Sequence, residues 1–513
     1  MAKLNSSFLK IQVRPWVFWP PFGLLIVAVI LSLVFPEEFV TNARGIQQII
    51  LESFSLGFSW VSLLMCVLAA GVMFSPLGRR KIGGAKAQPR LKLVSWFAIV
   101  LCTTIAVGIL FWASAEPLSH YLFPPEFLAL NAASPEAKNF ALGALYFHWG
   151  FTPYAIYAVP ALVFALMHYS SGRKRLSLGV MLIPLTGRLT NTKLETGLDL
   201  FSLFALVTGM SAALGAGILS LSGGVMAFFP NLNSTYLTAA VTGLILITFI
   251  ISASTGIDKG IKSLSLFNLV FFVLIAVLFI LLGEKSLILG NITQGFKAYT
   301  GNFLDLSMQL SGAGSKWTYD WSTFNFAMWM AWAPMTALFL GKIAIGRTVR
   351  EFLLVNWFFP ALFCLVWMGI FGGTTLDFAS SKPAVYEKLL ETVGPESIIY
   401  QVFADMGYFS LFASFYVLGI FISYVTAADS STEALASISM KKQNKDAFRS
   451  DTNLKVLWGT LIGFLAWVMV TFSGIDGVRI LSIIGGLPAL FFLLLVSVSL
   501  LLILFQPSKY LRN

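Results

Sequence analysis

The sequence has few of the residues on which most soluble enzymes and metalloproteins depend. It holds 3 cysteines and 3 histidines in 513 residues, and only 11% of its residues are charged. Cys66, Cys102 and Cys364 all lie in apolar stretches with no paired spacing, which argues against a disulfide framework or a zinc site. So few histidines also leave little for histidine-based catalysis or metal binding. With 57% hydrophobic residues and a mean hydropathy of +0.83, the chain does not have the composition of an ordinary soluble domain.

Long apolar runs stand where a soluble protein would have polar surface. Each run is about 20 residues long, which is enough to cross a hydrocarbon core of roughly 30 Å. They predict an all-α polytopic membrane protein with about twelve transmembrane helices. The expected spans lie at about 20–34, 49–74, 94–115, 143–168, 196–221, 236–255, 264–283, 322–341, 352–372, 409–433, 455–474 and 480–505.

The excess of lysine and arginine over acidic residues follows from the expected topology of the chain. A net charge of +11 and a pI near 9.5 would suggest nucleic acid in a soluble protein, but here lysine and arginine cluster in short loops between spans. The positive-inside rule places such loops in the cytoplasm, so no nucleic-acid partner is expected. The strongest cluster, between 79 and 92, has six basic residues and no acid. Both termini are then predicted to be cytoplasmic, in a multi-pass protein of the cell (inner) membrane.

The stretch from Phe324 to Phe352 combines an aromatic span with a basic exit. Trp329 and Trp332 are three residues apart and share a helix face, and Met328 lies one turn from Trp332. The π-face of tryptophan can hold a desolvated cation. The alternative is that these rings only pack against lipid or neighbouring helices.

A second aromatic set opens the fourth span. On one continuous helix, Trp149, Tyr157 and Tyr154 would fall at roughly 0°, 80° and 140°, so the three rings can line one concave side. Pro153 is expected to bend the helix around that side. An aromatic belt at the membrane interface is the alternative. His148 is expected to be a hydrogen-bonded buried histidine rather than a proton carrier.

Two polar stretches lie in or near other spans. The third span reads CTTIAVG from Cys102 to Gly108, which suits close helix packing or an unwound backbone whose carbonyls face a cavity. Glu116, followed by proline, is expected only to end that span at the interface. The tenth span carries hydroxyls and a carboxylate from Ser423 to Glu433, which are functional candidates unless they lie at its solvated end. The stretch 209–217, GMSAALGAG, predicts a close-packing surface.

Three of these segments together resemble the betaine/choline/carnitine transporter family. They are FHWG followed by PYAIY, the tryptophan-rich span that ends in GRTVREF, and VTAADSS. The resemblance implies a LeuT-type fold of two inverted five-helix repeats, at about 94–283 and 322–505. Residues 1–93 would hold a cytoplasmic N-terminus and two additional helices, 284–321 an extracytoplasmic loop, and 506–513 a short cytoplasmic tail. It also implies a homotrimer.

The family's cage for a quaternary ammonium group corresponds here to Trp149, Tyr154, Tyr157 and Trp329, and Trp332 matches an aromatic on the exit side. The sequence departs from the family pattern in and near the cage, because the family usually has tryptophan at the positions of Tyr154 and Met328. The substrate pathway would include Trp332 and Met328. The pathway would also include the positions of the family's glycine-rich motif G-x-G-x-G. These are Thr104, Ala106 and Gly108 here, of which only the last is glycine.

The resemblance also implies a sodium site in the sodium-coupled members of the family. Its positions here are Cys102, Ile105, Ser423, Thr426 and Ala427, and alanine at 427 removes one hydroxyl ligand. Asn268 aligns with the arginine that replaces sodium in the carnitine exchanger. Sodium coupling, proton coupling and exchange all stay open, and no cofactor is expected.

The implied function is that of a secondary transporter, not an enzyme. It would import a quaternary-ammonium or related zwitterionic compound of the glycine betaine, choline or carnitine type by alternating access. The alternatives are an exchanger, or a transporter of another methylated or zwitterionic compound. A channel is disfavoured because no ring of like charges or carbonyl filter is present. A membrane enzyme would need His148 with Asp429 or Glu433, which no motif links.

Overall fold

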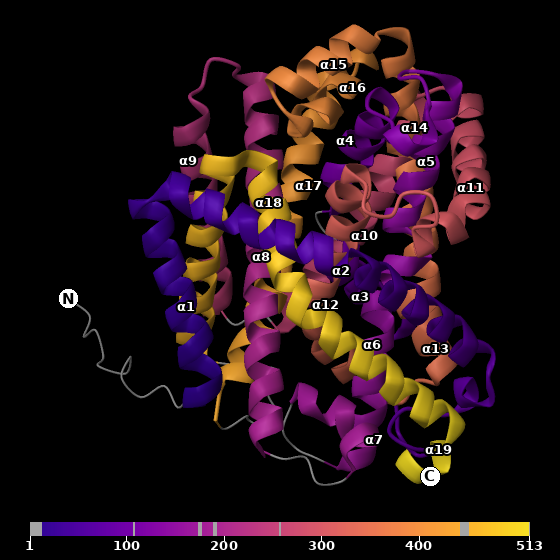
Figure 1. Ribbon diagram of the computed structural model, residues 1–513, viewed down its shortest axis with the longest axis vertical. Helices are drawn as coiled ribbons and strands as arrows, with labels where there is room; N and C mark the ends of the chain where they lie inside the picture. Colours follow the sequence, from indigo (N-terminus) through magenta and orange to yellow (C-terminus); the bar gives the residue numbers. More distant parts are fainter. Residues whose placement is uncertain are drawn as a thin grey trace.

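A computed structural model describes residues 13–105, 108–172, 177–187, 192–255, 258–441 and 451–511, and it is almost entirely helical there. The long helices follow one another closely along the chain (Figure 1). They are α1 (Pro15–Val34), α2 (Pro36–Phe74), α3 (Leu93–Ile105), α4 (Gly108–Leu122), α5 (Pro135–Trp149), α6 (Phe151–Ser171), α8 (Thr192–Phe228), α9 (Ser234–Thr255), α10 (Asp258–Leu282), α11 (Lys285–Met308), α12 (Phe324–Lys342), α14 (Phe359–Ser381), α17 (Phe409–Ser439) and α18 (Thr452–Phe505). Shorter helices are α7 (Ile183–Thr186), α13 (Val349–Leu353), α15 (Pro383–Thr392), α16 (Ile398–Asp405) and α19 (Pro507–Tyr510).

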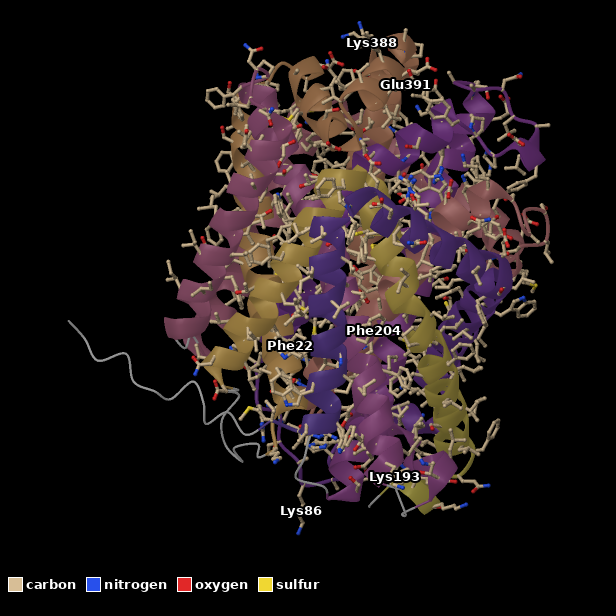
Figure 2. The ribbon with its side chains drawn as sticks, turned by 60° about the vertical axis from the view of Figure 1, so that its left-hand side comes forward. Phe22, Lys86, Lys193, Phe204, Lys388 and Glu391 are labelled. Atoms are coloured by element: carbon tan, nitrogen blue, oxygen red, sulfur yellow. The ribbon has the colours of Figure 1, made fainter. Side chains whose placement is uncertain are left out.

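Helices form here because a chain this apolar must satisfy its backbone hydrogen bonds within each segment when it lies in lipid. Charged side chains gather at the two ends of the bundle, as Lys388 and Glu391 show at one end and Lys86 and Lys193 at the other (Figure 2). Phe22 lies between these ends. This distribution is that of a membrane-spanning bundle.

The helices divide into a buried core and an outer layer. In the segment that holds α5 and α6, 94% of the most apolar window is buried inside the protein, and in α8 the share is 89%. The corresponding shares are 28% in α1, 28% in α9 and 33% in α10, whose remaining apolar side chains face outward. Helices α5, α6 and α8 therefore form the interior, and α12 and α18 pack against them.

Among the described residues, 8 helices are long and apolar enough to cross a membrane, or 9 when α3 and α4 count as one bent span. The twelve expected spans all fall on helices. Two of them are joined in α18, a helix of 54 residues with non-helical torsions at Gly474. Two others fall on α12, which is not among these helices, and on α17, of which the stretch Phe409–Val425 counts as a shorter apolar helix.

Breaks in the helices fall at positions that matter for the site. Gly150 (φ −95°, ψ −135°) separates α5 from α6, so the expected single helix through Trp149 and Tyr157 is wrong, and the break lies at Gly150 rather than at Pro153. Helices α3 and α4 meet at 51° across residues 106–107. A π-helical turn, Thr318–Thr323, leads into α12.

The predicted extracytoplasmic loop, 284–321, and the connection between the ninth and tenth expected spans, 373–408, both contain helices. Most of 284–321 is α11, whose apolar side packs against α5 and α14. The segment 373–408 completes α14 and adds α15 and α16. These two helices lie together at one end of the bundle, at the top of Figure 1. Helix α1 begins, and α19 lies, at the opposite end.

The GRTVREF segment ties α12 to the basic loop that follows α2. Gly346 has φ +80°, and a Cβ there would lie 2.2 Å from the backbone carbon of Gln88, so only glycine fits. Arg347 donates to the carbonyl of Leu91 at 2.8 Å. Thr348 and Glu351 form a capping box that starts α13. These residues therefore have structural roles at the end of the bundle where α1 begins.

Candidate functional site

A cavity of about 990 Å³, part of it open to solvent, lies between the core helices. Its walls come from α3, α4, α5, α6, α8, α9, α12, α17 and α18. Aromatic and small residues dominate them, and the residues nearest the predicted site are Thr103, Thr104, Gly108, Trp112, Trp149, Tyr157, Met328, Trp329, Trp332, Tyr424 and Ala427. Such a cavity, mostly apolar with few polar groups, suits a small organic ligand.

Trp329 is the centre of the predicted aromatic cage. Its ring centroid lies 5.7 Å from that of Trp149, 5.2 Å from that of Tyr154 and 4.6 Å from that of Tyr157. The structure thus brings all four predicted residues together. Trp149, Tyr157 and Trp329 line the cavity, whereas Tyr154 packs behind Trp329 and does not.

These centroid separations are those of rings in direct contact. No cation fits between Trp329 and its three partners in this arrangement, because such a group needs its own van der Waals thickness on each side. A cation can reach the rings only from the cavity, where Trp149, Tyr157 and Trp329 are available.

Gly108, which has no side chain, leaves the space that the indole of Trp149 occupies. A Cβ at Gly108 would lie 2.4 Å from Cη2 and 2.6 Å from Cζ3 of the indole, so the start of α4 must be glycine for Trp149 to pack there. The indole Nε1 donates to Oε2 of Glu116 at 2.8 Å. Of the three pathway positions from the glycine-rich motif, Thr104 and Gly108 line the cavity, and Ala106 lies outside the described residues.

The small residues 209–217 of α8 admit two large rings from neighbouring helices. The indole of Trp332 donates to the carbonyl of Gly209 at 3.0 Å. A Cβ at Gly217 would overlap the ring of Tyr424, which donates its hydroxyl to the carbonyl of Ala213. Tyr424 and Trp112 also line the cavity and were not predicted to do so, although Tyr424 lies within the polar stretch from Ser423 to Glu433.

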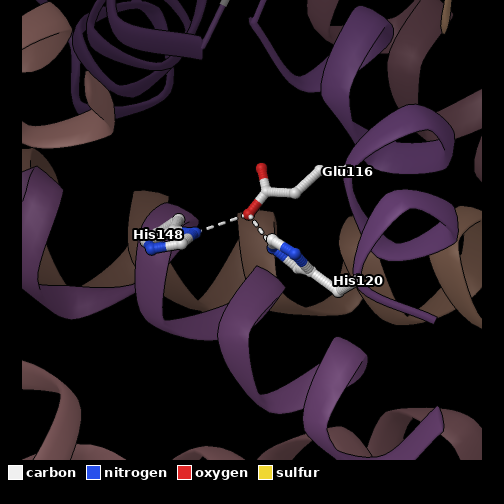
Figure 3. Close-up of side chains that lie close together, drawn as sticks. All are labelled: Glu116, His120 and His148. Carbon is white, nitrogen blue, oxygen red and sulfur yellow. Dashed lines mark hydrogen bonds and ion pairs between the residues drawn. The ribbon is translucent and has the colours of Figure 1, made fainter. Parts of the chain in front are cut away.

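Glu116 does not merely end a span. Its carboxylate is buried in α4 and accepts hydrogen bonds from two residues of α5, Trp149 and His148, the latter from Nδ1 to Oε1 at 2.6 Å. Figure 3 shows His148 and His120 pointing at this carboxylate. Glu116 and His120 are four residues apart and so share one face of a helix, which is the feature of the sequence that could have indicated this polar cluster.

The structure pairs His148 with partners other than those that a membrane enzyme would need. Its Nε2 lies 2.8 Å from Oγ of Ser322, which precedes α12. Glu433 instead forms an ion pair with Lys455 at 2.7 Å. The side chain of Asp429 lies outside the described residues. The expectation that His148 is buried and hydrogen-bonded is confirmed.

Two of the predicted sodium positions, Cys102 and Ser423, form hydrogen bonds with residues of α10. The thiol of Cys102 donates to the carbonyl of Ser265 at 3.1 Å, and the Asn268 amide donates to Oγ of Ser423 at 3.2 Å. Ala427 lines the central cavity. The side chains of Ile105 and Thr426 lie outside the described residues. Cys102 of α3 and Ser423 of α17 thus both contact α10, at two residues about one turn apart.

A profile of the betaine/carnitine/choline family transporters (BCCT) matches residues 16–509. The chain belongs to the BCCT family. The chain is 29% identical over 507 residues to the "Ectoine/hydroxyectoine transporter" of Virgibacillus pantothenticus, and the match covers 96% of this chain and 97% of that protein. It is 31% identical over 495 residues to the "Glycine betaine/proline/choline/ectoine transporter" of Vibrio parahaemolyticus, with 94% of this chain and 86% of that one covered.

Among solved structures, this BCCT protein is similar to a Na⁺-coupled sialic acid symporter in a substrate-bound outward-open state. The two chains are 14% identical, the match covers 90% of this chain and 98% of the other, and the TM-score is 0.48. The family resemblance inferred from the sequence is confirmed. The protein is a helical, multi-pass member of a membrane transporter family.

Proposed function

We propose that this protein is a secondary active transporter that imports a small quaternary-ammonium or related zwitterionic compound by alternating access. One observation carries the proposal: Trp149, Tyr157 and Trp329 present their rings to a single cavity among the most buried helices. The electron-rich faces of these rings attract a methylated ammonium group, which has no N–H to donate and cannot be held by hydrogen bonds.

The expected affinity follows from the number of rings. Each ring that faces a desolvated cation contributes about 0.5–2 kcal/mol. Three rings, reduced by the cost of removing the ligand from water, are consistent with dissociation constants of roughly micromolar to millimolar. The relatives are named for ectoine, glycine betaine, proline and choline, so the substrate class includes cyclic zwitterions as well as quaternary amines.

The remaining features are part of the same proposal. Two inverted repeats at about 94–283 and 322–505 would surround the cavity, after two additional helices in 1–93. The basic loop at 79–92 lies at the end of the bundle where α1 begins, which supports a cytoplasmic position for that end in the inner membrane. A homotrimer is expected from the family. Trp332, Met328, Thr104 and Gly108 form the substrate pathway on the cavity wall.

The function is tested with the full-length protein in proteoliposomes. Uptake of radiolabelled choline, glycine betaine, carnitine, proline and ectoine is measured with and without an inward sodium gradient, and again with unlabelled substrate inside. We expect at least one of these compounds to be accumulated or exchanged. If none is bound, accumulated or exchanged, the proposed function is wrong. Exchange without accumulation would assign the protein as an exchanger.

The cage is tested with two substitutions of similar size. Trp329→Phe keeps a π-face and should raise the apparent KM by less than about tenfold, whereas Trp329→Leu removes it and should raise KM by tenfold or more, equivalent to about 1.4 kcal/mol. Trp60→Leu, at a half-exposed tryptophan of α2, is the matched control. Equal effects of Trp329→Phe and Trp329→Leu would show that Trp329 only packs.

A further inference from the structure

A buried polar cluster lies directly against the aromatic cage, and the transport function proposed above gives it no role. Glu116 and His120 come from α4 and His148 from α5, and no side chain of the three is more than 2% exposed (Figure 3). Within the part of the chain that the structure describes, no lysine or arginine forms an ion pair with Glu116. A carboxylate buried without such a partner is costly in a membrane protein and marks a functional site by default.

The geometry favours a proton over a metal ion at this cluster. Oε1 of Glu116 and Nδ1 of His148 are 2.6 Å apart, a hydrogen-bond distance. Two ligands of one metal, each about 2.0–2.2 Å from it in a tetrahedral site, would lie roughly 3.3–3.6 Å apart. The indole of Trp317 donates to Nδ1 of His120 at 3.1 Å, so Nε2 of His120 carries its proton. That N–H lies 3.5 Å from Oε1 of Glu116 without forming a hydrogen bond, and a protonated nitrogen does not coordinate a cation.

His148 can hold one proton or two without moving. Its Nδ1–H donates to Glu116 in either state, and Nε2 faces the hydroxyl of Ser322 at 2.8 Å. A hydroxyl rotates freely, so Ser322 donates to the neutral imidazole and accepts from the imidazolium. The second proton comes from a hydronium ion, so that an O–H bond breaks as the N–H bond at Nε2 of His148 forms, and both changes reverse when the proton leaves to water. It turns a buried pair of net charge −1 into a neutral ion pair, which removes much of the cost of burying the carboxylate.

Trp149 connects this pair to the substrate. Its indole N–H donates to Oε2 of Glu116, and its ring lines the cavity against Trp329. Ser322 connects the other side of His148 to the π-helical turn that leads into α12, the helix of Trp329. A change of charge at the pair therefore acts on two walls of the cage.

Other charged and titratable groups face the cluster at its edges. The guanidinium of Arg479 lies 5.1 Å from the ring of Trp321, which itself lies 4.5 Å from the ring of His120. The thiol of Cys364 of α14 also lies near Glu116, and Asp320 belongs to the π-helical turn that carries Ser322.

We propose that the Glu116–His148 pair is the proton site of this transporter, which takes up one proton with the substrate and is linked to the cage through Trp149. This proposal rests on the proposed transport function and replaces the sequence-based expectation that His148 is not a proton carrier. Linkage is reciprocal, so the proton strengthens substrate binding by the same factor by which the substrate strengthens proton binding.

The proposal is tested with the full-length protein in liposomes that contain a pH-sensitive dye. Choline or glycine betaine is added outside, without sodium and with the membrane potential clamped. We expect the wild-type lumen to acidify as substrate enters, and an inward pH gradient to drive accumulation. Glu116→Gln and His148→Gln should reduce the gradient-driven accumulation by more than tenfold. Both variants should still exchange labelled for unlabelled substrate at a measurable rate, because exchange needs no net proton movement.

The pH dependence of substrate affinity and a control variant distinguish a loss of proton coupling from a loss of folding or of transport. Substrate affinity of the detergent-solubilised protein is followed by tryptophan fluorescence from pH 5.5 to 8.5, and it should depend on pH in the wild type but not in Glu116→Gln. Glu136→Gln, which removes an exposed carboxylate at the start of the same α5, should behave as wild type. The proposal is overturned if the wild type moves substrate without protons, or if both variants still acidify the lumen. Absence of exchange by the wild type would instead overturn the transport function.

Discussion

The packing of Gly108 against Trp149 gives a sharp test of how the cage is positioned. In Gly108→Ala the new Cβ would lie 2.4 Å from Cη2 of the indole, whereas an unstrained carbon–carbon contact is about 3.5–4.0 Å. The ring must therefore move by about 1 Å or more. Overpacking of this kind typically costs about 1–3 kcal/mol.

The same movement disturbs the hydrogen bond of 2.8 Å between Trp149 and Glu116. A hydrogen bond to a charged group contributes about 1.5–3 kcal/mol, so its weakening adds to the cost. We expect Gly108→Ala to lower the melting temperature in detergent and to weaken substrate binding by about tenfold or more, which corresponds to about 1.4 kcal/mol. Fluorescence-detected unfolding and equilibrium binding of labelled substrate measure the two effects.

A double variant separates the clash from the cage. Gly108→Ala with Trp149→Phe removes the indole atoms that the new Cβ would meet, so stability should return while affinity stays low. Gly71→Ala is the control, because nothing lies within 4 Å of a Cβ there and alanine is a better helix former by about 1 kcal/mol. Wild-type stability and affinity in Gly108→Ala would refute the packing described here.

Three other substitutions test features away from the cage. Gly346→Ala should lower expression and melting temperature, because its Cβ would overlap the backbone of Gln88 at a φ of +80°. Asp199→Asn should destabilise the protein by about 3–5 kcal/mol, measured by denaturant unfolding, because it leaves the buried Arg14 guanidinium, 2.6 Å from Asp199, without its partner charge. Burial raises the pKa of Glu396 from 4.5 to about 7, so the folded state prefers its neutral form, and the contribution of this residue to stability should fall as pH rises through that range. Glu396→Gln should remove that part of the pH dependence of the melting temperature.

Matched controls sharpen these expectations. Asp476→Asn removes a half-exposed carboxylate that pairs with Arg44 and with Arg479, each at 3.4 Å, and should change stability by no more than about 1 kcal/mol. If Asp199→Asn were equally mild, the Arg14 pair would not hold the ends of α1 and α8 together. A melting temperature of Glu396→Gln that still varies with pH as in the wild type would assign the effect to another group.

Much of the fold was predictable because apolar runs of span length are a local signal. The expected spans all fall on helices, although helix breaks such as that at Gly150 were not predicted. A wheel drawn through Trp149 and Tyr157 assumed one helix, and the true geometry depends on how α5 and α6 meet α12. The two rings nevertheless converge, because both contact Trp329.

The polar cluster was less predictable. The sequence shows a glutamate followed by a proline, which is typical of a helix end. Its burial results from His148, Trp149 and Ser322, which come from two distant segments of the chain. Contacts between residues so far apart in the chain cannot be predicted from the sequence around Glu116 alone. The side chains of Ile105 and Thr426, expected at the sodium site, lie outside the described residues, so their role stays a prediction.

The hydrogen bond from Trp149 to Glu116 also bears on how this protein could be redesigned or diversified. If Glu116 belongs to the proton site as proposed, replacing Trp149 to accept a new solute would also disturb this carboxylate, and selectivity and energy conversion could not be varied separately at that position. Tyr157 lines the same cavity, and within the described residues no hydrogen bond links it to Glu116. Libraries that alter solute preference while keeping the driving force should therefore begin at Tyr157, and natural divergence among related chains would be expected to follow the same route.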